Sequence, residues 1–192
     1  MHNLTEYLMV IAPPESVRNR IQAAREEFSR KFNYKLHLAR PHIALLRFFQ
    51  RERLESQLKF RLDTIARGQP PLLVELNGFG FFPSHTLFIH VDAGNRYKSL
   101  VKSFREAQAL LKADPEREPH FMLTPFVKIG HRLLPWQYEQ SLPEYQKKQF
   151  TARFMVDSLL LLKRREGEKA YQIVQRMELL NEPLTVRQGA LF

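Results

Sequence analysis

The segment PHIAL at residues 41–45 is matched later in the chain by PHFML at residues 119–123. In each segment a histidine follows a proline and leads into an apolar run. The first segment lies inside residues 35–49, which we predict to form a strand, and the second opens a run that we also predict to be a strand. Two Pro-His strands in one chain indicate that one folding unit occurs twice.

The first half of the chain alternates strands with helices. Residues 4–12 form an apolar run that ends at Pro13, which predicts a buried strand. A helix should begin near Pro14, and a second helix is predicted over residues 51–67, followed by a strand over residues 72–82. The apolar face expected for the first helix consists of Val17, Ile21, Ala24 and Phe28, with Arg25 on the opposite, polar side.

The second half repeats this order. A strand is predicted over residues 86–91, then a helix, the Pro-His strand, and a helix over residues 135–148 that Pro143 weakens. Residues 150–162 predict one long strand, and residues 170–179 predict a closing hairpin strand. The core face expected for the helix that precedes the second Pro-His strand consists of Val101, Phe104, Ala107 and Leu111.

The repeated order predicts a single two-lobed domain over residues 1–192, with repeats at residues 4–82 and 86–179 and a tail at residues 181–192. Repeats that pack face to face bring equivalent strands together about a pseudo-two-fold axis. On this interpretation His42 and His120 occupy equivalent positions and meet in the middle. The alternative is that the order reflects only the usual alternation of strands and helices in α/β chains.

The composition limits the chemistry that the chain can perform. The 192 residues include no cysteine, which excludes a disulfide scaffold, a thiolate metal site and a cysteine nucleophile. Thirty Lys and Arg against twenty Asp and Glu give a net charge of +10, which favours a nucleic acid or nucleotide partner, although a basic solvated surface is the alternative. The apolar runs are too short to span a membrane and the first residues do not resemble a signal peptide, so we expect a cytoplasmic monomer.

Two histidines that face one phosphorus atom can divide the work of cleaving a phosphate ester. Histidine titrates near neutral pH, so a neutral imidazole can take a proton from the attacking oxygen while a protonated one gives a proton to the leaving oxygen. This chemistry needs no metal and no other cofactor. No metal site is predicted, because His37 and His42 lie on opposite faces of the predicted strand and the other histidines have no matched partner.

The two Pro-His segments resemble the paired motifs of the 2H phosphoesterase superfamily, which includes the 2′-5′ RNA ligase-like proteins and the cyclic phosphodiesterases. The family pattern is His, any residue, Thr or Ser, and an apolar residue, and it occurs twice. The resemblance implies an α+β fold of two lobes, with two antiparallel-rich sheets and outer helices around a central cleft. It also implies a metal-independent phosphoesterase acting on 2′,3′-cyclic phosphates or 2′-5′ linkages in RNA or nucleotides, with His42 and His120 as the catalytic pair.

The sequence departs from the family pattern at the third motif position. At these substrate-binding positions Ala44 and Met122 replace the hydroxyl that holds the phosphate, and neither side chain can donate a hydrogen bond. Thr124 shares the strand face of His120, and Arg40 that of His42, so we expect these two to contact the phosphate instead. Two functions stay foremost, namely a phosphoesterase and a catalytically weakened or inactive relative that binds RNA or a nucleotide. A structural or partner-binding domain with no anion site is a third alternative.

Overall fold

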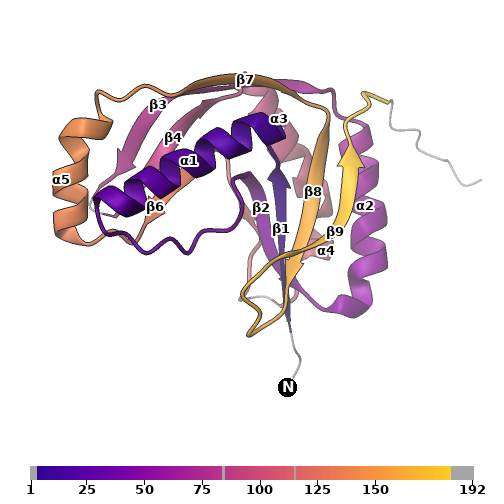
Figure 1. Cartoon of the computed structure of the whole chain (residues 1–192). Coiled ribbons are helices and arrows are strands. Elements are labelled where there is room, and N and C mark those ends of the chain that lie inside the picture. The colour runs from indigo at the N-terminus through magenta and orange to yellow at the C-terminus, as the bar shows by residue number, and fades with distance from the viewer. Residues whose placement is uncertain (1–3, 84, 115, 183–192) are drawn as a thin grey trace, which may run out of the picture.

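Two antiparallel sheets, with helices packed against them, form the computed structural model of the chain, which describes residues 4–83, 85–114 and 116–182 (Figure 1). The α+β class and the pair of antiparallel sheets predicted from the sequence are confirmed. Of the tail predicted at residues 181–192, Asn181 and Glu182 belong to the described part, and the rest of that prediction lies outside it.

The first sheet, called sheet A, has the strand order β5-β2-β1-β8-β9. Its strands are β1 (Thr5–Ile11), β2 (Ile43–Gln50), β5 (His120–Phe121), β8 (Ser158–Arg164) and β9 (Gln172–Glu178). The central strand β1 is buried along its whole length, as its apolar sequence predicts. The short helix η1 (Glu52–Leu54) leads into α2 (Glu55–Arg67), which lies beside β9 (Figure 1).

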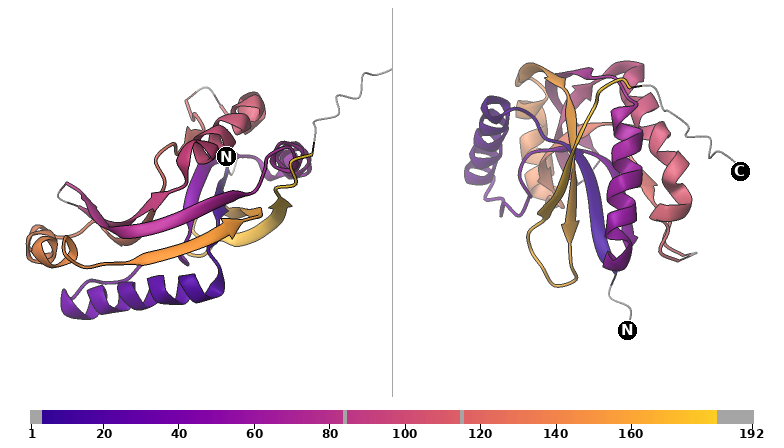
Figure 2. Two further views of the ribbon diagram at one scale, coloured as in Figure 1. Left: turned by 90° about the horizontal axis from the view of Figure 1, so that it is seen from above. Right: turned by 90° about the vertical axis from the view of Figure 1, so that its right-hand side faces the viewer.

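The second sheet, called sheet B, has the strand order β6-β4-β3-β7. Its strands are β3 (Leu72–Phe82), β4 (Thr86–Asp92), β6 (Phe126–His131) and β7 (Thr151–Val156). The remaining helices are α1 (Glu15–Lys31), α3 (Gly94–Ser103), η2 (Phe104–Ala107), α4 (Gln108–Leu111) and α5 (Pro135–Tyr145). Helix α1 runs along one side of the sheets, while α3 and α4 lie on the opposite side (Figure 2).

Neither sheet is made from one half of the chain alone. Strand β3 comes from the first half but pairs with β4 and β7 in sheet B, while β8 comes from the second half but pairs with β1 in sheet A. The single long strand predicted over residues 150–162 is therefore two strands, because the chain passes from sheet B to sheet A at Asp157. The predicted repeats consequently do not coincide with the sheets.

The elements around the Pro-His segments also differ from those predicted. The strand expected over residues 35–49 begins only at Ile43, since Pro41 has no N–H to pair in a sheet. The second Pro-His segment is a strand only at His120–Phe121, and β6, which follows Pro125, was not predicted. The helix expected over residues 135–148 continues through Pro143 and ends at Tyr145.

Helix α1 buries the apolar face predicted for it, which consists of Val17, Ile21, Ala24 and Phe28. The Phe28 ring lies 5.0 Å from Phe32 and 5.5 Å from each of Tyr34 and Tyr145, measured between ring centroids. These aromatic contacts hold α1 and α5 together, so that α1 presents its remaining buried side chain, Arg25, towards sheet B.

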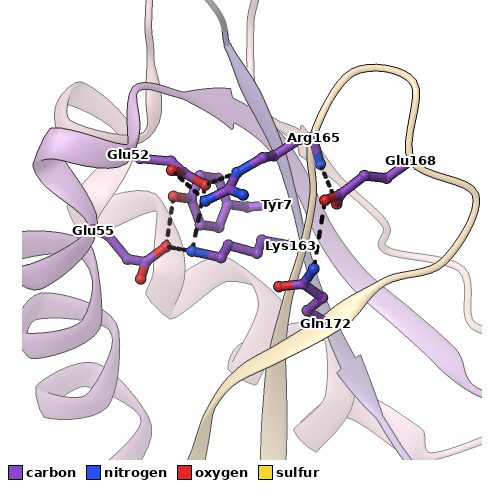
Figure 3. A network of polar contacts seen from close by, with 7 residues as sticks. All are labelled: Tyr7, Glu52, Glu55, Lys163, Arg165, Glu168 and Gln172. Carbon is purple, nitrogen blue, oxygen red and sulfur yellow. Dashed lines mark hydrogen bonds and ion pairs between the residues drawn. The ribbon is translucent and has the colours of Figure 1, made fainter.

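A polar network ties the β8–β9 hairpin to the start of α2 (Figure 3). The Tyr7 hydroxyl donates to Glu55 over 3.0 Å, and the Lys163 ammonium lies 2.7 Å from Glu55 and 3.4 Å from Glu52. The Arg165 guanidinium pairs with Glu52 over 2.9 Å. Both glutamates lie in the first turn of a helix, where the helix dipole favours negative charge. Lys163 and Arg165 are thus paired within the fold.

Candidate functional site

A cavity of ≈ 480 Å³ opens between the two sheets and is lined by side chains from both. This volume lies within the range of small-molecule sites. Sheet A supplies Ala44, Arg47 and His120 to its wall, and sheet B supplies Phe126 and Lys128. The other polar side chains in the wall are Glu6, Arg25, His37, His42, Arg164 and Tyr171.

His42 is half-buried at the point where the chain enters β2. Its Nδ1 lies 2.7 Å from the Arg40 carbonyl oxygen, which can only accept a hydrogen bond, so Nδ1 carries the proton and donates it. Burial lowers the pKa of His42 below its ordinary value, and the positive charges of Arg25 and Lys128 lower it further, although the bond to Arg40 works in the other direction. His42 is therefore neutral at pH 7, with the lone pair of Nε2 available to take a proton.

Arg25 reaches the cavity wall from α1 and is only 2% exposed. Its Nε donates to the Lys128 carbonyl over 2.9 Å, and its Nη1 donates to the Ala39 carbonyl over 2.7 Å. Burial lowers the pKa of Arg25 to about 10, which leaves the guanidinium charged at pH 7. Arg25 thereby joins helix α1 to β6 and to the segment before His42. Its burial contradicts the prediction that it lies on the polar face of the helix.

Lys128 extends from β6 into the same cavity. Burial lowers its pKa below the ordinary value, and the like charges of Arg47 and Arg25 lower it further. No salt-bridge partner of Lys128 occurs among the residues in the described ranges. An anion in the cavity would relieve the repulsion among these cations, because each opposite charge nearby stabilises the charged form.

On the sheet A side of the cavity, Glu6 is shared by two guanidinium groups. Its carboxylate lies 2.5 Å from the Arg47 Nε and 2.6 Å from the Arg164 Nη2. Burial of Glu6 works to raise its pKa, but the hydrogen bonds from Arg164 and Arg47 outweigh burial and the pKa lies below its ordinary value. Among the lining residues that the structure describes, four Lys and Arg side chains thus face a single carboxylate.

The register of the strands identifies the counterpart of the His42 segment in sheet B. Strand β2 pairs with β1 through a bulge at which Met9 faces Leu46 and Val10 faces Ala44. Strand β6 pairs with β4 through the same irregularity, where Leu87 faces Gly130 and Phe88 faces Lys128. In both pairs the bulged strand carries one extra residue, so Ala44 corresponds to Lys128.

Counting back two residues along each strand, His42 corresponds to Phe126. The sequence before these residues agrees, since Pro41 precedes His42 and Pro125 precedes Phe126. The segment that corresponds to PHIAL is therefore PFVKI at residues 125–129. In sheet B an apolar ring stands where sheet A has an imidazole, and an ammonium stands where sheet A has a methyl group.

The prediction that His120 occupies the position equivalent to His42 is wrong. Strand β5 pairs with the edge of β2, where His120 faces Arg47, and both Pro-His segments therefore belong to sheet A. The physical reason is that residues 120–121 pair with the edge of β2 as β5. The chain enters sheet B, as β6, only after it has passed Pro125. His120 is nevertheless exposed towards the same cavity as His42 and lines its wall.

The four predicted substrate-binding residues are divided between the cavity and the surface. Ala44 and Met122 line the cavity, and their carbonyl oxygens accept hydrogen bonds from the Tyr97 hydroxyl over 3.0 and 2.8 Å. Thr124 lies exposed in a bend, and Arg40 is exposed with only its carbonyl directed at His42. Neither Thr124 nor Arg40 is among the residues that line the cavity, and their contact with a substrate stays a prediction.

Sequence reasoning missed the residues that make the cavity cationic. Arg25, Arg47, Lys128 and Arg164 were not predicted as site residues, and Phe126 was not recognised as a motif position. The available signal was Pro125, which repeats the proline before His42. The described residues contain no group of three or more His, Asp or Glu side chains placed to hold a metal ion, and no described helix is long and apolar enough to cross a membrane.

Comparison with known proteins places this geometry in a family. The family model of the 2′-5′ RNA ligase superfamily matches residues 13–168. The Thermus thermophilus protein TT0787 superposes with a TM-score of 0.68 at 18% identity, covering 93% of this chain and 100% of that one. The Escherichia coli protein LigT, solved with 3′-AMP, superposes with a TM-score of 0.66 at 13% identity, covering 92% and 98%.

A comparison with curated proteins gives no match. At identities below one fifth, the similarity to TT0787 and LigT is a similarity of fold. The family match, by contrast, spans well over half of the chain and includes β2, β6 and most of the cavity wall. On that match, supported by the shared fold, this chain belongs to the 2′-5′ RNA ligase superfamily.

Proposed function

We propose that this chain binds the phosphate group of a nucleotide or an RNA end in the cavity between its sheets, and that it acts as a binding member of its superfamily. The observation that carries the proposal is the pair Phe126 and Lys128, which stand at the sheet B positions matching His42 and Ala44. A phosphate bound between His42 and Lys128 would meet a cation where the family pattern has a hydroxyl.

The charges around the cavity support an anionic ligand. Lys128 and Arg25 lie close enough to His42 to lower its pKa, and Arg47 lowers that of Lys128. A phosphate would offset this repulsion and accept charge-assisted hydrogen bonds, which are worth about 1.5–3 kcal/mol each. Structures of LigT have been solved with 3′-AMP and with phosphate, which makes the same ligands suitable probes for this chain.

Phe126 argues against rapid cleavage by a histidine from each sheet. Cleavage of a phosphate ester by two imidazoles needs a base on one side of the phosphorus and an acid on the other. A phenyl ring can perform neither proton transfer, and the loss of a general acid or base typically costs about 10²–10⁴ in rate. His42 alone supplies the base but leaves the second transfer on the sheet B side without an imidazole.

A second candidate is the metal-independent phosphoesterase in which His42 and His120 form the catalytic pair. It is favoured by one observation, namely that both side chains line the same cavity. In that reaction the Nε2 of His42 would take a proton from water as it attacks a 2′,3′-cyclic phosphate. His120 would give a proton to the ribose oxygen that leaves, and the product would be a phosphomonoester.

The test combines binding and turnover on the same purified protein. We expect calorimetry to show binding of 3′-AMP that Lys128→Ala weakens by tenfold or more, at about 1.4 kcal/mol per factor of ten. The exposed Lys102 on α3, which does not line the cavity, provides a matched control as Lys102→Ala. Turnover of 2′,3′-cyclic AMP that disappears in both His42→Ala and His120→Ala would establish the phosphoesterase. If the wild-type protein does not bind 3′-AMP, the proposed binding function is refuted.

A further inference from the structure

Three phenylalanine rings gather on the face of sheet B that carries Lys128. The Phe82 and Phe88 rings stack with their centroids 4.4 Å apart. The Phe126 ring meets Phe82 edge-on at 5.0 Å and Phe88 at 5.6 Å. Phe88 is buried, whereas Phe82 and Phe126 are half-buried, so the cluster keeps part of its surface open.

The register places this cluster beside the cations of the cavity. On β6, Phe126 and Lys128 are two residues apart and share one face of the strand. Across the sheet Lys128 faces Phe88, and Phe126 faces His90. Phe126 is also the member of the cluster that lines the cavity wall. An aromatic surface and a cation thus lie about 6.6 Å apart along one strand, a span that one nucleotide covers between its phosphate and its base.

Gly80 makes room for this surface. It lies opposite Phe88 on β3, and a Cβ atom there would come within 2.7 Å of the Phe88 Cζ and 2.5 Å of the His90 Nε2. Both distances are shorter than side-chain packing allows. Without a side chain at residue 80, Phe88 and His90 lie directly over β3, and Phe126 rests against the support that Phe88 and Phe82 provide.

We propose that Phe126, supported by Phe82 and Phe88, forms a stacking subsite for a nucleobase whose phosphate lies at Lys128 and His42. This inference rests on the proposed function and names its ligand class, which is a nucleotide or an unpaired RNA end rather than a sugar phosphate. Stacking suits the site because every base presents a π-face and needs no hydrogen-bond readout. Phe126, which stands where the second imidazole of the family pattern would be, would therefore contact the base of the ligand.

The experiment compares 3′-AMP with ribose 3-phosphate, which carries a hydroxyl group in place of the base, by calorimetry at low salt. The wild-type protein should bind 3′-AMP about 5- to 150-fold more tightly, which is the range that stacking on one aromatic side chain provides. Phe126→Leu, which keeps an apolar side chain in the wall, should abolish this preference and leave the affinity for ribose 3-phosphate unchanged. Phe126→Trp should retain the preference. The matched control is Phe60→Ala, since Phe60 is 77% exposed on α2 and does not line the cavity.

The outcomes separate this inference from the proposed function. Equal affinity of the wild-type protein for both ligands, or a preference that survives Phe126→Leu, would overturn the stacking subsite while leaving phosphate binding intact. Binding of neither ligand would refute the proposed function and the subsite together. Loss of affinity for both ligands in Phe126→Leu, with unchanged thermal unfolding, would show that Phe126 shapes the phosphate site and would also overturn the subsite.

Discussion

Phe126, the first residue of β6, lies at the position that matches His42, which immediately precedes β2, because the β1–β2 and β4–β6 pairs share one bulge in one register. The same register matches Lys128 with Ala44. A site with one imidazole, one ammonium and one aromatic ring can hold a nucleotide, but it cannot move two protons symmetrically across a phosphorus atom. This relationship determines which substitutions should restore catalysis and which should not.

The first prediction concerns restoration of the motif. The triple variant Ala44→Thr, Phe126→His, Lys128→Thr rebuilds a His-x-Thr pattern in both sheets. Because it returns a proton donor and two hydroxyl ligands, hydrolysis of 2′,3′-cyclic AMP should rise by about 10² or more over the wild-type rate. The comparison variant Ala44→Thr, Met122→Thr should show no such gain. A gain in the comparison variant alone would mean that the strand register does not identify the second motif.

The second prediction concerns Arg25. Replacing it by Met leaves the Lys128 and Ala39 carbonyls without the donors that now satisfy them. The free energy of unfolding in urea should fall by about 2 kcal/mol or more, since each buried group left unpaired costs about 1–3 kcal/mol. Arg30→Met is the matched control, because Arg30 is exposed on the same helix. Equal destabilisation by the two substitutions would show that the buried hydrogen bonds of Arg25 contribute nothing.

The third prediction concerns pH. In the folded chain the pKa of His42 lies below its ordinary value of 6.5, chiefly because of burial. Below about pH 6.5 the unfolded chain therefore binds more protons at this residue than the folded chain does, and stability falls as the pH falls. Above that pH both states carry a neutral imidazole and the contribution vanishes. His42→Gln should reduce the acid-side slope of the unfolding free energy between pH 5 and 7, and an unchanged slope would contradict the assignment.

The fourth prediction concerns Gly80. In Gly80→Ala the added methyl group collides with Phe88 and His90, which should destabilise the protein by about 1–3 kcal/mol, as overpacking of a core does. Adding His90→Ala removes the nearest of these contacts and should recover part of the loss, as measured by thermal unfolding. A single variant as stable as the wild type would mean that the aromatic cluster yields easily and does not form a fixed surface.

Local pattern was sufficient to predict much of the fold. Periodicity within one element predicts that β1 and one face of α1 are buried. The structure buries all of β1 and the four side chains of the α1 face, which are Val17, Ile21, Ala24 and Phe28. Periodicity does not show where an element pairs. Asp157 lies within a continuous apolar pattern, and only the pairing of the flanking segments with different sheets divides that pattern into β7 and β8.

The site was harder to predict because it depends on contacts distant in the sequence. PHFML matches PHIAL by residue type, whereas PFVKI matches it by cross-strand register, which no local pattern contains. Arg25 likewise sits at the edge of the helical face. It is buried because it reaches carbonyl groups 14 and 103 residues away. Both histidines line one cavity, but His120 reaches it from β5 at the edge of sheet A and not from a position equivalent to that of His42.

A crystal structure of the protein with bound 3′-AMP tests the central claim most directly. The account predicts a phosphate within hydrogen-bond distance of the Lys128 Nζ and beside the His42 ring, with the adenine ring against Phe126. A phosphate held between His42 and His120 and remote from Lys128, or a nucleotide bound outside the cavity, would contradict it.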